Sequence, residues 1–212
     1  MIPWILRLKK ANHKEIAAAQ DIIVEELYKV FNNAILHGGT AIWRCYRGNR
    51  FSEDIDAYIP KGKEKIKVFF KNLEKRGLTV EKMKLADNSV YSNMRYNRIY
   101  VRFEATFQKF NGSLREYETT NGNLITVYTL TPEELIKEKV PTYLKRLKIR
   151  DLYDIFFLLR HVNKNEQITD SLSKLVKEFK PPVDKEDLKV IVLEGLVPTV
   201  EKMLEYIKER VN

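Results

Sequence analysis

A pair of glycines followed by two alternating aspartates most constrains how this chain of 212 residues folds. Apolar side chains recur at helical spacing over residues 14–36, and we expect the Gly38-Gly39 pair to end that helix. Residues 54–60 alternate and finish at a proline, which predicts a strand. On that strand Asp54 and Asp56 share one face, and Ile55 points into the core.

These residue types suit the binding of a phosphate and its counter-ion. Two glycines let the backbone approach a phosphate closely, and Thr40 adds a hydroxyl and, if it opens a helix, an amide end that favours an anion. Neighbouring carboxylates repel one another unless a cation lies between them, and Mg²⁺ takes oxygen ligands from carboxylates and phosphates. Glu104, in the middle of another predicted strand, is the candidate third carboxylate.

Each piece also has an ordinary explanation. A Gly-Gly pair can simply end a helix, and alternating aspartates can lie on a solvated strand face. Glu104 can be a cross-strand partner of Arg98 or Arg102. The pieces gain specificity only through their order on one helix-loop-strand frame.

Further elements complete an α/β part that extends to about residue 130. A helix is predicted over 63–75, ended by Gly77, with four apolar side chains inward: Ile66, Phe69, Phe70 and Leu73. Strands are predicted at 78–85, on an edge, at 98–107, and at 124–130 after a turn at 121–123. The fold class expected is α/β (α+β), with a short, mixed, largely antiparallel sheet and helices on one face.

The character of the chain changes at Thr131. Thr131-Pro132-Glu133-Glu134 is a capping box with proline at the first helical position. Helices are predicted from there to about 146, over 149–161 and over 200–211. We therefore expect a catalytic domain at 1–130 and a helical domain at 131–212, packed together around a cleft that holds the site.

Composition narrows the partners and the compartment. Lysine and arginine outnumber the acids by 38 to 29, and the net charge of +9 favours an anionic partner, with nucleic acid first. Basic helix faces that keep the protein in solution are the alternative. Cys45 is the single cysteine, which excludes an internal disulfide and fits a reducing compartment. No apolar run approaches the length of a membrane span and no secretory signal is evident, so we expect a cytoplasmic protein.

The motifs together resemble a known family. Gly38-Gly39-Thr40, thirteen intervening residues and Asp54-Ile55-Asp56 match the pattern of the DNA polymerase β-like nucleotidyltransferase superfamily. The fuller string from Arg50 to Asp56, with Lys139 and the segment 150–154, resembles the AbiEii/MenT branch, the toxins of type IV-class toxin–antitoxin pairs. The resemblance covers about residues 36–160.

The resemblance implies a role for each matching residue. Asp54 and Asp56 would hold Mg²⁺, with Glu104 as the third metal ligand or the base. The triphosphate of an NTP would lie against Gly38, Gly39 and Thr40, with Ser52 of the same string. Lys139 would neutralise triphosphate charge, and an aspartate of segment 150–154 would complete the site.

Helical periodicity favours Asp151 over Asp154 as that aspartate. Asp151 flanks the apolar stripe of its helix, whereas Asp154 is expected nearly opposite the stripe. The alternative for Asp151 is a salt bridge to Arg146, Lys148 or Lys139, and Lys139 can equally be a solvated helix residue.

The implied reaction is transfer of a nucleoside monophosphate from an NTP to an acceptor hydroxyl, with tRNA 3′ ends as the expected acceptor and a cognate antitoxin as a protein partner. Three tyrosines near arginines, Tyr91, Tyr96 and Tyr100, suit RNA stacking or, equally, strand packing. The alternatives are a protein or small-molecule acceptor, or a non-catalytic nucleotide- or RNA-binding module on the same fold.

Overall fold

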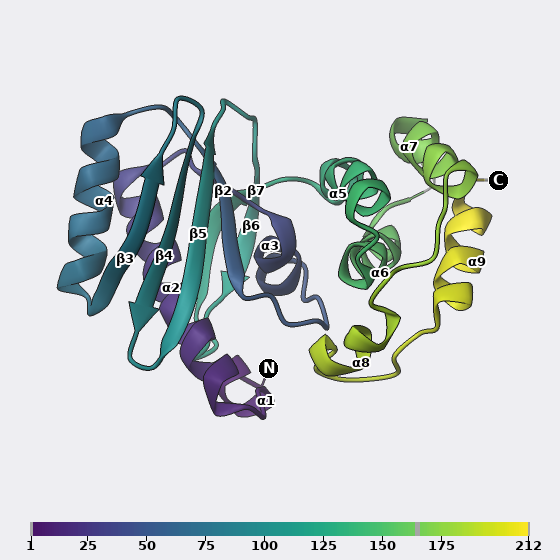
Figure 1. The fold of residues 1–212 in the computed structure, drawn as a ribbon, viewed down its shortest axis with the longest axis horizontal. Helices are drawn as coiled ribbons and strands as arrows, with labels where there is room; N and C mark the ends of the chain where they lie inside the picture. The colour runs from purple at the N-terminus through teal and green to yellow at the C-terminus, as the bar shows by residue number, and fades with distance from the viewer. Residues whose placement is uncertain (1, 164–165, 212) are drawn as a thin grey trace. The chain divides into compact units, whose positions relative to one another are not determined.

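The computed structural model describes residues 2–163 and 166–211 and divides into two compact units (Figure 1). The first unit comprises Met1–Arg47 and Phe51–Thr129, and the second comprises Gly48–Arg50 and Leu130–Asn212. The short segment Gly48–Arg50 joins the helical unit, although it lies between two elements of the sheet unit in sequence. The chain is mixed α/β, as predicted.

Seven strands of the described chain form one mixed sheet in the order β3-β4-β5-β2-β1-β7-β6. Two neighbouring pairs, β1 with β7 and β2 with β5, are parallel, and the other pairs are antiparallel. The strands are β1 (Ile35–His37), β2 (Asp54–Ile59), β3 (Leu78–Leu85), β4 (Ser89–Tyr96), β5 (Ile99–Phe107), β6 (Ser113–Glu118) and β7 (Leu124–Thr129). The largely antiparallel mixed sheet and its edge strand β3 are confirmed.

Helices α2 and α4 pack on the same face of this sheet. The four helices of the unit are α1 (Trp4–Arg7), α2 (Ala11–Val30), α3 (Gly38–Cys45) and α4 (Lys63–Lys75). The four apolar side chains predicted to point inward from α4 are all buried, and Phe69 contacts Phe103 of β5. The apolar alternation of β5 therefore has its partner in α4, and the other face of β5 carries polar residues.

The predicted helix over 14–36 is wrong at its end. The helix α2 stops at Val30, a turn follows at Asn32-Asn33, and Ile35–His37 is the strand β1. Gly38 does not end a helix but begins α3. A short apolar run has no period of its own, so a central strand that is paired on both sides looks the same as one more helical turn.

The sequence reasoning also missed elements. Strands β4 and β6 were not predicted, and neither were the helices α1, α7 and α8. Strand β4 alternates in burial along most of its length, but a buried serine, Ser92, and Tyr96 stand among its inward residues, so its apolar contrast is weak.

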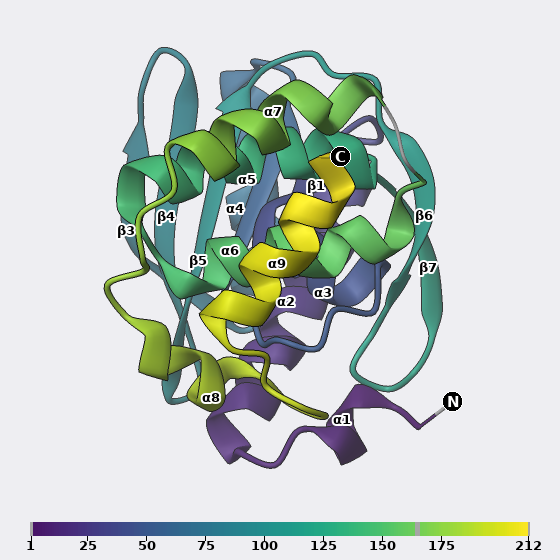
Figure 2. The same ribbon diagram turned by 90° about the vertical axis from the view of Figure 1, so that its right-hand side faces the viewer.

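The second unit is helical (Figure 2). Its α-helices are α5 (Pro132–Arg146), α6 (Ile149–Leu158), α7 (Glu166–Lys177), α8 (Leu188–Ile191) and α9 (Val200–Val211). Helix α5 packs on α6 and α7, and α9 packs on the same two helices. The predicted capping box is confirmed, since the Thr131 hydroxyl accepts from the Glu134 amide and the Glu134 carboxylate accepts from the Thr131 amide.

Two further observations concern reactivity and membranes. Burial raises the pKa of the Cys45 thiol to about 12, so this side chain stays protonated at neutral pH and is a packing residue. Among the helices described here, none has the length and apolar character needed to cross a bilayer.

Candidate functional site

The aspartate pair lies on β2 as the alternation predicted. Asp54 and Asp56 are partly exposed, and Ile55 between them is fully buried. Because successive strand residues point to opposite faces, both carboxylates project from the sheet face that α2 and α4 do not cover.

Glu104 lies on the same face. Its strand β5 runs parallel to β2, and Glu104 is the register partner of Asp56. Neighbouring strands are spaced by about 5 Å, so the sheet itself brings a third carboxylate beside the pair. Glu104 is exposed, and no ion pair to it occurs in the described part of the chain. The cross-strand ion pair with Arg98 or Arg102, which was the alternative explanation for Glu104, is therefore not formed in the described part of the chain.

Gly38 must be glycine at its position beside Asp56. Its φ of +70° lies in the left-handed region, and a Cβ there would overlap the Asp56 carboxylate. The chain leaves β1 and enters α3 at this residue, so the backbone at the start of α3 passes directly against the acidic strand.

Thr40 and Ser52 hold this junction together from the inside. The Thr40 hydroxyl is fully buried and donates to the backbone carbonyl of Asp54. The buried Gln20 amide donates to the Ser52 carbonyl at 2.8 Å. The Thr40 hydroxyl thus has a backbone partner, and it fixes the first turn of α3 against the start of β2.

Gln20 is a site-supporting residue that the sequence reasoning missed. It is fully buried on α2, and its Nε2 also lies 3.4 Å from the Thr40 hydroxyl. The available signal was a glutamine on the same helix face as Ile16 and Ile23, which lie one turn away on either side.

Arg102 engages the Asp54 carboxylate through two hydrogen bonds. Arg102, the register partner of Asp54 on β5, donates from Nε at 2.7 Å and from a terminal nitrogen at 2.5 Å. The hydrogen bonds to Asp54 raise the pKa of the guanidinium. Over residues 2–163 and 166–211, no three His, Cys, Asp or Glu side chains are gathered as they would be around a metal ion. With Asp54 held by Arg102, the three carboxylates do not converge on one point.

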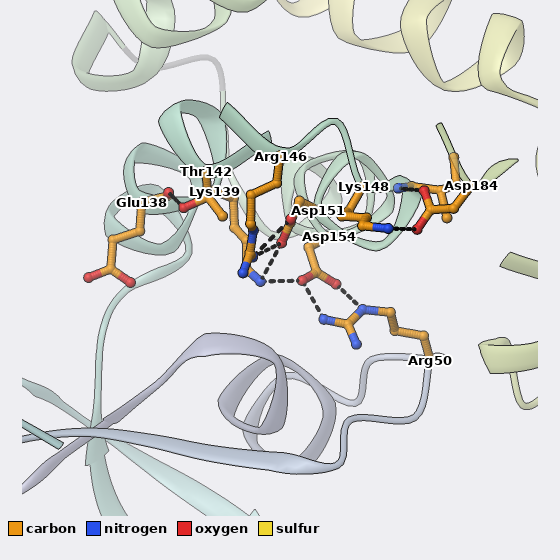
Figure 3. A network of polar contacts seen from close by, with 10 residues as sticks. Arg50, Glu138, Lys139, Thr142, Arg146, Lys148, Asp151, Asp154 and Asp184 are labelled. Carbon is orange, nitrogen blue, oxygen red and sulfur yellow. Dashed lines mark hydrogen bonds and ion pairs between the residues drawn. The ribbon is translucent and has the colours of Figure 1, made fainter. Parts of the chain in front are cut away.

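Lys139 and Asp151 belong to the helical unit, where they form part of a buried charge cluster (Figure 3). Its buried members are Arg50, Lys139, Asp151 and Asp154, and the exposed Arg146 completes it. The Lys139 ammonium lies 2.7 Å from Asp154 and 3.2 Å from Asp151. Arg146 also donates to Asp151, at 3.0 Å. The salt bridges from Asp151 to Arg146 and Lys139, named as its alternative explanation, are therefore present.

The expected placement of Asp154 is wrong. It was expected nearly opposite the packed stripe of its helix, but it is fully buried, as is Asp151. Helix α6 buries eight of its ten residues, so it has no polar side. A helix wheel assumes one buried face, and it cannot rank two aspartates on a helix that is surrounded.

Arg50 explains how a charge at Asp154 is tolerated. Its guanidinium donates to the two Asp154 oxygens at 2.5 Å and 2.6 Å. Burial by itself raises the pKa of Asp154, but Arg50 and Lys139 outweigh burial and hold the pKa below its ordinary value. The sequence reasoning gave Arg50 no role of its own, because its partner lies 104 residues away.

The chain matches a family of known proteins in sequence and resembles solved structures in fold. The family model described as nucleotidyl transferase AbiEii toxin, type IV TA system, matches residues 22–196. The crystal structure of JHP933 from Helicobacter pylori is similar with a TM-score of 0.65 and 19% identity, covering 95% of this chain and 91% of that chain. MenT4, the nucleotidyltransferase toxin Rv2826c from Mycobacterium tuberculosis H37Rv, gives a TM-score of 0.64 and 18% identity, covering 97% of this chain and 85% of that chain. These structures share the fold; no curated protein sequence matches the chain.

Proposed function

This chain belongs to the AbiEii family of nucleotidyl transferase toxins of type IV toxin–antitoxin systems, and from that premise we propose that it transfers a nucleoside monophosphate from an NTP to the 3′ end of tRNA with Mg²⁺. The family makes it a nucleotidyltransferase and implies a nucleotide substrate and an antitoxin partner. The observation that carries the finer proposal is the carboxylate row of Asp54, Asp56 and Glu104 beside the start of α3.

The carboxylate row fits a hard divalent cation. Asp56 and Glu104 are register partners on adjacent strands, and Asp54 projects from the same face. Carboxylate oxygens are the ligands that Mg²⁺ prefers, and a nucleotidyl-transfer site adds phosphate oxygens to them. When bound, the ion would neutralise charge that develops on the triphosphate and acceptor oxygens. Arg102 would first release Asp54, and Arg102 is half-exposed, which makes that release inexpensive.

The backbone at Gly38, Gly39 and Thr40 is the proposed binding element for the triphosphate. It opens a helix, and the amide end of a helix favours an anion. Thr40 and Gln20 keep this turn fixed against β2, so the backbone amides of the turn keep one position relative to the carboxylates of β2. The proposal retains Ser52 beside this turn, Lys139 for triphosphate charge, and Asp151 as the acid that completes the site.

The proposed reaction needs one proton acceptor. The acceptor's 3′-oxygen attacks the α-phosphorus, the bond to pyrophosphate breaks, and the hydroxyl proton passes to a carboxylate. Glu104 is our choice of base, since it is exposed and has no ion pair in the described part of the chain, whereas Asp54 is held by Arg102. The net charge of +9 favours a polyanionic acceptor over a small molecule.

The experiment is transfer of label from each of four α-labelled NTPs to total RNA, with Mg²⁺ or with EDTA. We expect label on tRNA that requires Mg²⁺ and is lost in Asp56→Asn. Asp87→Asn is the matched control, because Asp87 is an exposed aspartate in the turn between β3 and β4. Label on protein instead of RNA would replace tRNA by a protein acceptor, and NTP binding without any transfer would leave a binding module.

A further inference from the structure

The sheet face that carries the carboxylates continues into a basic and aromatic surface, which we name the outer sheet face. It is formed by the outward residues of β3, β4 and β5: Lys82, Lys84, Tyr91, Asn93, Arg95 and Tyr100. We propose that this face binds the unpaired 3′ end of the RNA acceptor, with bases stacked on Tyr91 and Tyr100 and phosphates against Lys82 and Lys84. The proposal rests on the proposed function for the identity of the acceptor.

Strand register places these residues in rows that lead to the carboxylates. One row runs across four strands through Lys84, Tyr91, Glu104 and Asp56, each the register partner of the next. Partners on adjacent strands lie about 5 Å apart and on the same face. Tyr91 is therefore the immediate neighbour of the acidic site, and Lys84 lies one strand beyond it.

A second row continues the same pattern. It runs through Lys82, Asn93, Arg102 and Asp54. Beyond it, Arg95 and Tyr100 are partners, and Arg95 is ion-paired to Glu81 at 2.8 Å. The face therefore changes from acidic on β2 to basic on β3, with one tyrosine beside the carboxylates and another further along β5.

The two tyrosines are not needed for the core. Most inward residues of β4 and β5, such as Val90 and Phe103, are apolar and buried on the side of α2 and α4, whereas Tyr100 is 53% exposed and Tyr91 is partly exposed. Neither ring stacks on another aromatic ring or a cation within the described residues. Tyr96, which the sequence grouped with them, is the register partner of Leu78 and Ile99 and so belongs to the opposite face.

The positive charge of the β3 side of the outer sheet face favours a polyanionic partner, namely a nucleic acid. Lys82 and Lys84 are exposed, and no ion pair to either is found in residues 2–163 and 166–211. Unpaired bases stack on exposed tyrosines without regard to sequence, and lysines track the phosphates, which is the usual way single strands are held. A duplex presents no free base faces, so the occupant is the single-stranded end.

The test is binding of a single-stranded RNA of roughly 12 nucleotides, labelled at its 5′ end, followed by fluorescence anisotropy in EDTA without NTP. We expect Tyr91→Ala/Tyr100→Ala to weaken binding at least about fivefold and Tyr91→Phe/Tyr100→Phe to keep it, because phenylalanine preserves stacking. We expect Lys82→Ala/Lys84→Ala to lower the slope of log affinity against log salt by about 1.4, at about 0.7 per phosphate contact.

Lys65→Ala/Lys71→Ala is the matched control, since both lysines are exposed on α4, which packs on the opposite face of the sheet. RNA affinity equal to wild type in the tyrosine and lysine variants, or an equal loss in the control, would overturn the proposal and leave the face to a protein partner. The absence of metal and NTP separates this result from the reaction. If RNA binds through this face but no transfer occurs, the proposed function alone is refuted. If the tyrosine and lysine variants bind RNA as wild type does and also transfer label to tRNA, the proposal for the outer sheet face alone is refuted.

Discussion

Replacement of Asp154 by alanine tests the buried charge cluster most directly. The Asp154 carboxylate accepts two hydrogen bonds from Arg50 and lies 2.7 Å from the Lys139 ammonium. The cluster has three cations and two anions, so the variant leaves three cations facing Asp151 alone. Arg50 is only 4% exposed and would lose both hydrogen bonds that it donates to Asp154.

The expected loss of unfolding free energy is about 3–5 kcal/mol, the usual cost of removing one partner from a buried ion pair. Most of that cost comes from the hydrogen bonds and the ion pair that the buried Arg50 guanidinium loses, so the double variant Arg50→Ala/Asp154→Ala should lose less than the sum of the two single variants. We expect a coupling free energy of about 1–3 kcal/mol between the two positions.

Urea titrations followed by circular dichroism at the helical band measure both quantities. Glu186→Ala, which removes an exposed ion pair with Lys189, is the control and should leave the midpoint unchanged. A loss under about 1 kcal/mol in Asp154→Ala, with additive single variants, would show that the cluster is not electrostatically coupled.

The same pair predicts a pH dependence. The folded-state pKa of Asp154 is lower than its ordinary value, because Arg50 and Lys139 outweigh the effect of burial. Its contribution is therefore fully present above the unfolded pKa of about 4 and is lost as the pH falls below that value through the folded pKa. The difference in stability between wild type and Asp154→Asn should be constant from pH 7 to about pH 5 and should shrink in more acidic solution.

Three further predictions concern the sheet unit. Gly38→Ala should cost about 1–2 kcal/mol for the left-handed backbone and should also abolish nucleotidyl transfer, because the new methyl group displaces the Asp56 carboxylate; a fully active variant would contradict this. Arg102→Ala should strengthen Mg²⁺-dependent NTP binding by up to about fivefold in calorimetry, since a half-exposed ion pair with Asp54 is worth no more than about 1 kcal/mol. Asp21 of α2 accepts a hydrogen bond from the fully buried Arg44 of α3, so Asp21→Ala should lower the free energy of unfolding by about 3–5 kcal/mol in urea; a change within about 0.5 kcal/mol would refute that role.

The parts of this fold that were predicted correctly depend on neighbours in sequence. The alternation of Asp54, Ile55 and Asp56 fixes which side chains share a face, whatever the sheet around them does. The capping box at Thr131 and Glu134 is a contact between residues three apart. The inward side of the helix 63–75 follows from apolar spacing alone.

The parts that could not be predicted depend on partners far away in the chain. Gln20 acquires its role only because Ser52, 32 residues later, offers a backbone carbonyl. The strand Ile35–His37 is recognisable only from β2 and β7 on either side of it, since three apolar residues carry no period. Arg102 lies on an exposed strand face, and only the parallel register of β2 and β5 brings it to Asp54.

In helix α6, ion pairs with residues outside the helix, and not helical periodicity, account for the positions of two buried aspartates. Asp151 and Asp154 are both fully buried, and each is ion-paired to a different arginine. The Lys139 ammonium contacts both carboxylates. If it moved away from them, each carboxylate would still have an arginine partner. Arg146 would still neutralise Asp151, and Arg50 would still neutralise Asp154. The cation that the proposed reaction needs for triphosphate charge is therefore one whose departure leaves neither carboxylate without an arginine partner.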